Sequence, residues 1–151
     1  MTTANVVYAT ITGNNQDVAD IVTEALEDLD VTVTESEISQ TDVTDLTDND
    51  IIVIVPYTYD EGALPEEGLD FFDDLADIDL TGKIFGVTGS GDVFYGDDYG
   101  TAVDRFDERL ASTGATRGVA KLKINLSPDE DDISQLDQFA QSLVAALPQH
   151  D

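Results

Sequence analysis

Hydroxyl, amide and glycine residues gather between the first apolar run of the chain and the first segment with helical spacing. Residues 6–9 (VVYA) are followed by Thr10, Ile11, Thr12, Gly13, Asn14 and Asn15. On a strand-to-helix turn, glycine lets the backbone approach an anion, and the unpaired N–H groups of the first helical turn point toward it. No Lys or Arg lies here or in the next segment, which excludes a Gly-Lys-Ser/Thr nucleotide loop. The pattern indicates a site for one phosphate monoester held by neutral donors, with ordinary helix capping as the alternative.

Two more segments rich in tyrosine and glycine follow later apolar runs. The first, after residues 51–55, contains Pro56, Tyr57, Thr58, Tyr59, Asp60 and Gly62. The second, after residues 84–88, contains Ser90, Gly91, Asp92, Tyr95 and Tyr99. Tyrosine rings offer flat faces on which a planar ring can stack, although the first pair could equally pack on its own loop. The glycines near residue 89 do not have G-x-G-x-x-G spacing, so no dinucleotide fingerprint is present.

Apolar runs and helical patterns alternate along the whole chain. The patterns predict strands at 4–9, 31–38, 51–55, 84–88 and near 118–124, and helices at 14–29 and near 66–76, 101–113 and 131–147. For residues 38–50 the sequence allows either a short helix or an irregular loop. Such alternation is typical of a parallel sheet with helices on both faces, in one domain spanning 1–151. Ligands bind such sheets outside the carboxyl ends of the strands, where the three polar segments begin.

The charge of the chain is strongly negative and spread over its whole length. Six Lys and Arg face 33 Asp and Glu, for a formal net charge of -27. Counterion release requires Lys and Arg patches that this composition lacks, so nucleic acid and anionic membranes are excluded as natural partners. Dispersed acidity with so few lysines resembles the proteins of halophiles that accumulate salt, because molar salt shortens the Debye length to about 3 Å. The sequence therefore predicts a halophilic, acidic protein.

The cysteine and histidine content excludes several further kinds of chemistry. The chain has no cysteine, which excludes disulfides, thiolate nucleophiles and iron–sulfur ligation, and its one histidine, His150, lies next to the C-terminus. We predict no metal site and no catalytic residue. The chain enters a strand at once, without a basic leader or a long apolar run, so we expect a soluble cytoplasmic protein.

Taken together, the three segments resemble those of the flavodoxins, which are electron carriers that bind FMN. TITGNN is similar to their T/S-x-T-G-N-T phosphate loop, and TYDEGALPEEGLDFFDDL is similar to their T-W-G-D-G-x-L loop with its helix. GSGDVFYGDDYGTAVDRF is similar to the G-S-G-D-x-x-Y and AVD-x-F segment of short flavodoxins. The resemblance covers nearly the whole chain. It implies a three-layer flavodoxin-like sandwich with strand order 2-1-3-4-5.

The resemblance also implies roles for residues that match its motifs. Phosphate contacts are implied for Thr10, Thr12, Gly13, Asn14, Asn15 and, nearby, Thr58. Tyr59 takes the position of a tryptophan on one flavin face, and Tyr95 that of a tyrosine on the other. Ser90, Gly91 and Asp92 are expected at the pyrimidine edge. Asp60 departs from the family pattern, because it stands where a glycine usually faces flavin N5.

We therefore expect a low-potential one-electron carrier that holds FMN noncovalently. Its partners would be a reductase donor and an oxidoreductase acceptor, met by transient contact, with the carrier itself a monomer. An FMN enzyme or activating subunit of the same fold, such as the type that activates ribonucleotide reductase, is one alternative. A receiver-type signalling domain is another, but it needs acidic residues at the strand ends where this chain has Thr10 and Tyr57.

Overall fold

Strands and helices alternate through the part of the chain that the computed structural model describes, namely residues 2–8, 14–38, 41, 43–55, 73–75, 77–91, 101–119, 121–125 and 130–146. The elements are β1 (Thr3–Tyr8), α1 (Asn14–Glu27), β2 (Thr32–Glu37), the 3₁₀ helix η2 (Val43–Asp48), β3 (Ile51–Val55), β4 (Ile84–Gly91), α3 (Thr101–Ser112), β5 (Thr116–Arg117), β6 (Leu122–Asn125) and α4 (Glu130–Ala145).

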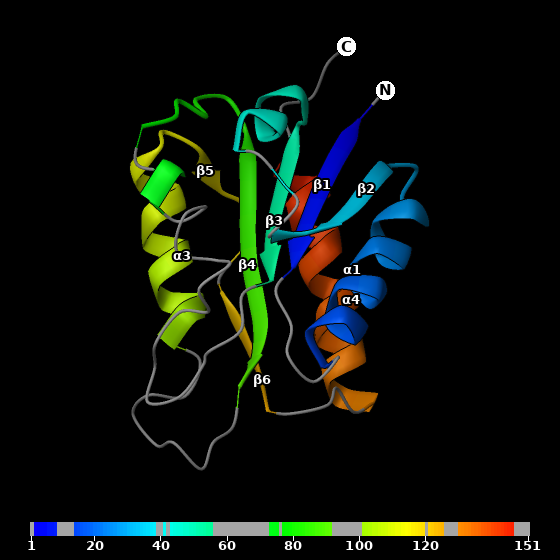
Figure 1. Cartoon of the computed structure of the whole chain (residues 1–151). Helices are drawn as coiled ribbons and strands as arrows, with labels where there is room; N and C mark the ends of the chain where they lie inside the picture. The colour runs from blue at the N-terminus through cyan, green and yellow to red at the C-terminus, as the bar shows by residue number, and fades with distance from the viewer. Residues whose placement is uncertain are drawn as a thin grey trace.

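The strands form one parallel sheet with β1 inside it. The order is β2-β1-β3-β4, and β5 and β6 both pair with β4 at the fifth position. The expected order 2-1-3-4-5 is therefore confirmed. Figure 1 shows the sheet between two helical layers, with α3 on one side and α1 and α4 on the other. This is the three-layer sandwich expected from the sequence.

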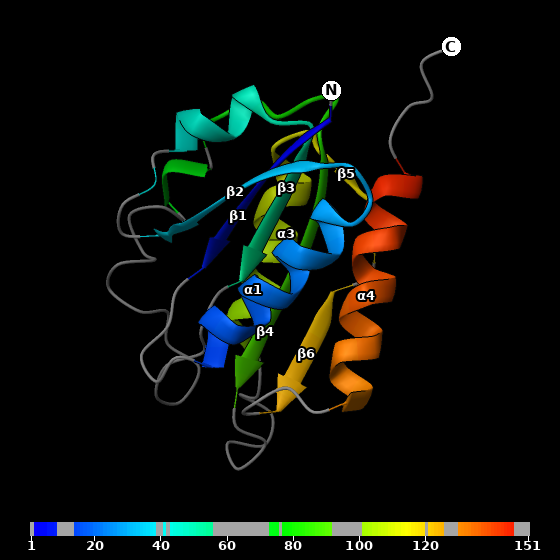
Figure 2. The ribbon, with the colours of Figure 1, turned by 90° about the vertical axis from the view of Figure 1, so that its right-hand side faces the viewer.

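Residues of β3 supply both halves of the core. Ile51, Val53 and Val55 belong to the apolar cluster under α1 and α4, whereas Ile52 and Ile54 belong to the cluster under α3. All five are fully buried, as a continuous apolar run in a parallel sheet predicts. Figure 2 shows α1 and α4 side by side over the first of these faces. Both faces of β3 are therefore covered by helices. Its last residue, Val55, lies at the edge of the sheet where the parallel strands end.

The fifth strand position is interrupted, which differs from the single strand expected near 118–124. Arg117 pairs with Phe85 and Leu122 pairs with Thr88, so five steps along this strand match three along β4. Two extra residues are therefore accommodated between β5 and β6. A side chain at position 118 would collide with Ile84 Cγ2. The backbone N–H of Gly118 donates to the Phe85 carbonyl at 2.9 Å. The glycine allows the strand to bend close to β4 at this point.

The helices agree with the sequence patterns except at their ends. α1 stops two residues short of the expected position, α3 ends within a residue of it, and α4 begins one residue early. β4 continues to Gly91, three residues beyond its expected end. Within residues 38–50, for which the sequence allowed a short helix or a loop, Val43–Asp48 form the 3₁₀ helix η2. Of the helix expected near 66–76, residues 73–75 are helical and the others lie outside the described residues. None of the helices in the described ranges is long and apolar enough to cross a membrane.

Candidate functional site

The three polar segments follow strands that lie next to one another. Tyr8 at the end of β1 is opposite Val55 at the end of β3, and Ile54 of β3 is opposite Val87 of β4. Neighbouring strands lie about 4.8 Å apart, so the β1 and β4 positions are separated by about 10 Å. The segments that begin at residues 9, 56 and 92 therefore all leave the same edge of the sheet.

This edge includes the point where the strand order reverses. From β1 the chain runs first to β2 on one side and then to β3 on the other. At such a switch point the two connecting segments separate and leave a crevice at the carboxyl ends of the strands. The residues 9–13 and 56–72 are the segments that follow the two strands beside it, β1 and β3.

The amino end of α1 supplies the donors for an anion here. α1 begins at Asn14, and its first N–H groups have no acceptor within the helix. The helix dipole adds a partial positive charge at this end. The first turn contains an acidic residue, Asp17. An anion held at this end would depend on backbone donors, and the neutral side-chain donors that the sequence predicts stay a prediction.

The structure places four of the predicted site residues by their backbone. Asn14 and Asn15 open α1, and Ser90 and Gly91 close β4. The other predicted contacts lie outside the described residues: Thr10, Ile11, Thr12, Gly13, Pro56, Tyr57, Thr58, Tyr59, Asp60, Gly62, Asp92, Tyr95 and Tyr99. The backbone thus brings the predicted segments to one edge, and the side-chain contacts stay predictions.

A buried hydroxyl near this edge is a residue that the sequence reasoning missed. Thr88 lies three residues before the end of β4, is fully buried, and its Oγ1 has no hydrogen-bond partner among the described residues. Thr88 and Val87 lie on opposite faces of β4. Thr88 shares its face with Ile84, and this face packs under α1 and α4. A buried hydroxyl that is unpaired within the described part of the chain fits a polar ligand or an ordered water. The only sequence signal was one hydroxyl within an apolar strand.

Carboxyl groups crowd the outer side of the same region, between α1 and β2. Thr23 Oγ1 donates to Glu35 Oε1 at 2.7 Å, and the Glu35 carboxyl also hydrogen-bonds Asp20. Burial, followed by this contact with Asp20, raises the pKa of Glu35 to about 7. Burial and the nearby Glu37, Glu35 and Asp20 raise the pKa of Tyr8. These groups place negative charge near the end of β1. An anion at the amino end of α1 would therefore be held by neutral donors despite repulsion from these groups.

Within the described ranges, no three acidic or histidine side chains come together as metal ligands. A doubly wound parallel sheet with neutral anion donors and aromatic segments at its switch point defines a class of protein that binds a phosphate-bearing planar ligand.

Comparisons with known proteins give the family. The model of the family described as Flavodoxin matches residues 6–138. Probable flavodoxin 1 of Bacillus subtilis is 34% identical over 146 residues, which is 96% of this chain and 92% of that protein. A solved short-chain flavodoxin is 59% identical with a TM-score of 0.96, over 98% of this chain and 100% of that one. The flavodoxin of Streptococcus pneumoniae TIGR4 is 46% identical with a TM-score of 0.93, over 96% and 99%.

The chain belongs to the flavodoxin family. Its function is that of an FMN-binding electron carrier, and flavodoxins are electron-transfer proteins that pass electrons to redox partners rather than enzymes. The resemblance drawn from the sequence is confirmed. Neither an FMN enzyme nor a receiver domain is favoured by these comparisons.

Proposed function

We propose that this flavodoxin is a low-potential one-electron carrier that holds one FMN noncovalently where β1, β3 and β4 end. The observation that carries the proposal is the convergence of three predicted FMN-binding segments on one edge, beside the switch point. The family match from residue 6 to residue 138 spans all three segments. A reductase donor and an oxidoreductase acceptor would meet this edge by transient contact.

The residues present fit the cofactor. The phosphate would lie at the amino end of α1, held by Thr10, Thr12, Gly13, Asn14, Asn15 and Thr58, with Ile11 in the same turn. The ring would lie between Tyr59 and Tyr95, with Pro56, Tyr57, Asp60, Gly62 and Tyr99 in the surrounding segments and Ser90, Gly91 and Asp92 at its pyrimidine edge. FMN supplies the one-electron chemistry, and the chain supplies orientation and exclusion of water.

Electrostatics supports the low potential. An added electron makes the site more negative, and the chain already has a formal charge of -27. The carboxyl cluster of Asp20, Glu35 and Glu37 lies beside the strand that leads into the phosphate segment. Negative charge in the surroundings raises the free energy of reduction, and thus lowers the midpoint potential.

The proposal extends to the setting of the protein. We infer a single domain over residues 1–151 that works as a monomer in the cytoplasm of a salt-accumulating cell. The support is the dispersed acidity, with 33 acidic residues against 6 basic ones. At about 1 M salt the Debye length falls to roughly 3 Å, which screens the repulsion among these charges. Nucleic acid and membranes are excluded as partners by the same charge.

Removal of two hydroxyls tests the phosphate assignment. In Thr10→Ala with Thr12→Ala, each lost bond to the phosphate should cost about 1.5 to 3 kcal/mol, which weakens FMN by at least roughly a hundredfold for two bonds. Riboflavin lacks the phosphate, so its affinity should change little. Thr34→Ala with Thr47→Ala is the matched control, because both of these threonines are exposed and lie on β2 and η2. Equal losses for FMN and riboflavin would contradict the assignment.

A further inference from the structure

Buried polar side chains are few in the part of the chain that the structure describes: Asn5, Thr88, Asp107 and Thr113. Three of the four bind a neighbouring side chain or carbonyl; Thr113 Oγ1, for example, donates to the Leu110 carbonyl. Thr88 differs, because its fully buried Oγ1 has no hydrogen-bond partner among the described residues. A buried hydroxyl without a partner destabilises the fold. Its presence here calls for a partner that binds it in the working protein.

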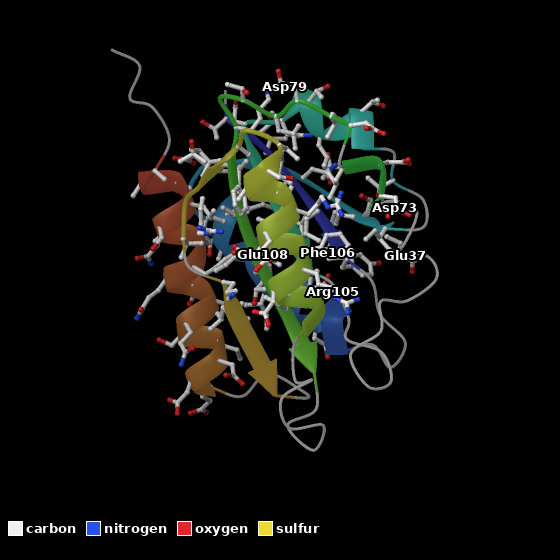
Figure 3. The ribbon with its side chains drawn as sticks, turned by 90° about the vertical axis from the view of Figure 1, so that its left-hand side faces the viewer. Glu37, Asp73, Asp79, Arg105, Phe106 and Glu108 are labelled. Carbon is white, nitrogen blue, oxygen red and sulfur yellow. The ribbon has the colours of Figure 1, made fainter. Side chains whose placement is uncertain are left out.

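The neighbours of Thr88 on β4 show where its hydroxyl lies. Two residues before it and on the same face, a Cβ at Gly86 would meet the ring of Phe139 of α4. The opposite face of β4 is covered by α3, whose Phe106, labelled in Figure 3, belongs to one cluster with Val87. The hydroxyl of Thr88 is therefore enclosed between the sheet and the layer of α1 and α4.

Thr88 lies level with the residue from which the chain enters the phosphate segment. Tyr8 is opposite Val55, and Ile54 is opposite Val87, so the next position places Val55 beside Thr88. Tyr8 and Val55 also face α1 and α4. Since neighbouring strands lie about 4.8 Å apart, Thr88 is about 10 Å from Tyr8 across the sheet. Directly after Tyr8 the chain leaves β1 toward the amino end of α1.

The helix α1 lies over all three of these strands. It contacts β1, β3 and β4, and Val18, in its second turn, is fully buried in the same cluster as Tyr8 and Val55. Figure 2 shows that α1 and α4 both begin at the end of the sheet to which β4 points. The layer that encloses the Thr88 hydroxyl is therefore the layer that contains the amino end of α1.

The dimensions of these layers fit a short hydrogen-bonded connection. Packed layers lie about 10 Å apart, and the backbone of an α-helix has a radius of about 2.3 Å. A hydroxyl on the sheet that binds one water reaches about 5.6 Å, as two hydrogen bonds of about 2.8 Å each. Such a connection spans most of the space between a sheet and the backbone of a helix above it.

We propose that Thr88 is a positioning residue for the FMN phosphate: its hydroxyl binds the chain at the amino end of α1, directly or through one buried water. The proposal rests on the proposed function. Thr88 acts through α1, because the phosphate lies at the outer end of that helix and the hydroxyl lies beneath it. The bound phosphate fixes this end of α1 and so completes the hydrogen bond. The FMN-free chain then carries the cost of the unpaired hydroxyl, and the FMN complex does not.

Two substitutions at this position separate the hydroxyl from the packing. Thr88→Val keeps the shape of the side chain and removes the hydroxyl, whereas Thr88→Ser keeps the hydroxyl. In urea titrations the FMN-free Thr88→Val chain should be at least as stable as the wild type. Its Kd for FMN should rise roughly three- to tenfold, the effect of one lost hydrogen bond, while its Kd for riboflavin stays unchanged. Thr88→Ser should bind FMN within about twofold of the wild type.

Thr113→Val is the matched control. Thr113 is also a buried threonine, but it precedes β5 at the opposite end of the sheet, and its hydroxyl is paired with the Leu110 carbonyl. Loss of this bond should lower the stability of the FMN-free chain and leave the Kd for FMN unchanged. The two valine variants should therefore show opposite effects on stability and on FMN binding.

Several results would overturn the role of Thr88. Unchanged FMN affinity in Thr88→Val, in a chain whose wild type prefers FMN to riboflavin, would overturn it and leave the proposed function intact. An equal loss for riboflavin, or the same loss in Thr88→Ser, would show that packing is responsible. A less stable FMN-free Thr88→Val chain would show that the hydroxyl is already paired without the cofactor. A wild type that binds FMN no better than riboflavin would overturn the proposed phosphate site, and this role with it.

Discussion

The carboxyl of Glu35 should make the stability of this protein depend on pH in a direction that is unusual for an acidic residue. The carboxyl lies between β2 and α1, where it accepts from Thr23 Oγ1 at 2.7 Å and hydrogen-bonds Asp20. Two carboxyl groups in contact are stable when they share a proton. Burial and this contact raise the pKa of Glu35 from 4.5 to about 7 in the folded protein. The unfolded chain lacks both effects.

The sign and size follow from linkage. Because the folded state binds the proton more tightly than the unfolded state, the stabilisation is complete below pH 4.5 and is lost as the pH rises to about 7. The difference between these pKa values corresponds to at most about 3.4 kcal/mol, at 1.36 kcal/mol for each pH unit. Glu35 is half-buried, so solvent screening reduces this to roughly 1 to 2 kcal/mol.

The variant Glu35→Gln isolates this contribution. Glutamine keeps the acceptor for Thr23 and offers an N–H to Asp20 at every pH, so it mimics the protonated residue. We expect Glu35→Gln to raise the free energy of unfolding by about 1 to 2 kcal/mol at pH 8 and by almost nothing near pH 4.5. Denaturant titrations at the same molar salt measure both values. Glu24→Gln, which removes an exposed charge from α1, the helix that faces Glu35, should change stability by less than about 0.5 kcal/mol at either pH.

Two results would refute this reasoning. If Glu35→Gln gives no gain at pH 8, the carboxyl is not strained in its ionised form. If the gain is the same at both pH values, its origin is not the protonation of Glu35.

Three further predictions concern packing and charge. Thr88→Val removes the buried hydroxyl that has no partner among the described residues, so it should stabilise the FMN-free chain by about 1 kcal/mol in urea titrations, and a loss would show that the hydroxyl is paired. Gly86→Ala should destabilise by about 1 to 3 kcal/mol, because its Cβ would lie 2.7 Å from Phe139 Cζ and 3.0 Å from Leu143 Cδ2; unchanged thermal unfolding would contradict this packing. Transfer from molar salt to about 0.05 M, where the Debye length exceeds 10 Å, should release FMN or unfold the chain, and unchanged flavin fluorescence and circular dichroism would count against the halophilic assignment.

Much of the fold could be predicted because each element is encoded locally. The run Ile51–Val55 is short and apolar at every position, which is typical of a strand covered on both faces, and the structure buries all five residues. The order of the strands came from the resemblance of the phosphate segment and the tyrosine segments to a known family. The convergence of those segments on one edge then follows from the topology.

Other features could not be predicted because they depend on contacts between distant residues. The break between β5 and β6 lies in a run with ordinary strand composition, and only the register against β4 reveals two extra residues. Glu35 and Asp20 are separated by fifteen positions and meet only when α1 packs on β2. Arg117 and Asp107 likewise pair across α3 and β5, so this ion pair becomes visible only in three dimensions.

Titration of the purified FMN-free chain with FMN in molar salt, followed by redox titration of the complex, is the decisive test of the proposed cofactor site and its one-electron chemistry. We expect one FMN per chain, much weaker binding of riboflavin, and two separate one-electron midpoint potentials, both low. Binding of riboflavin as tight as that of FMN, or a single two-electron step, would contradict a phosphate-anchored one-electron carrier.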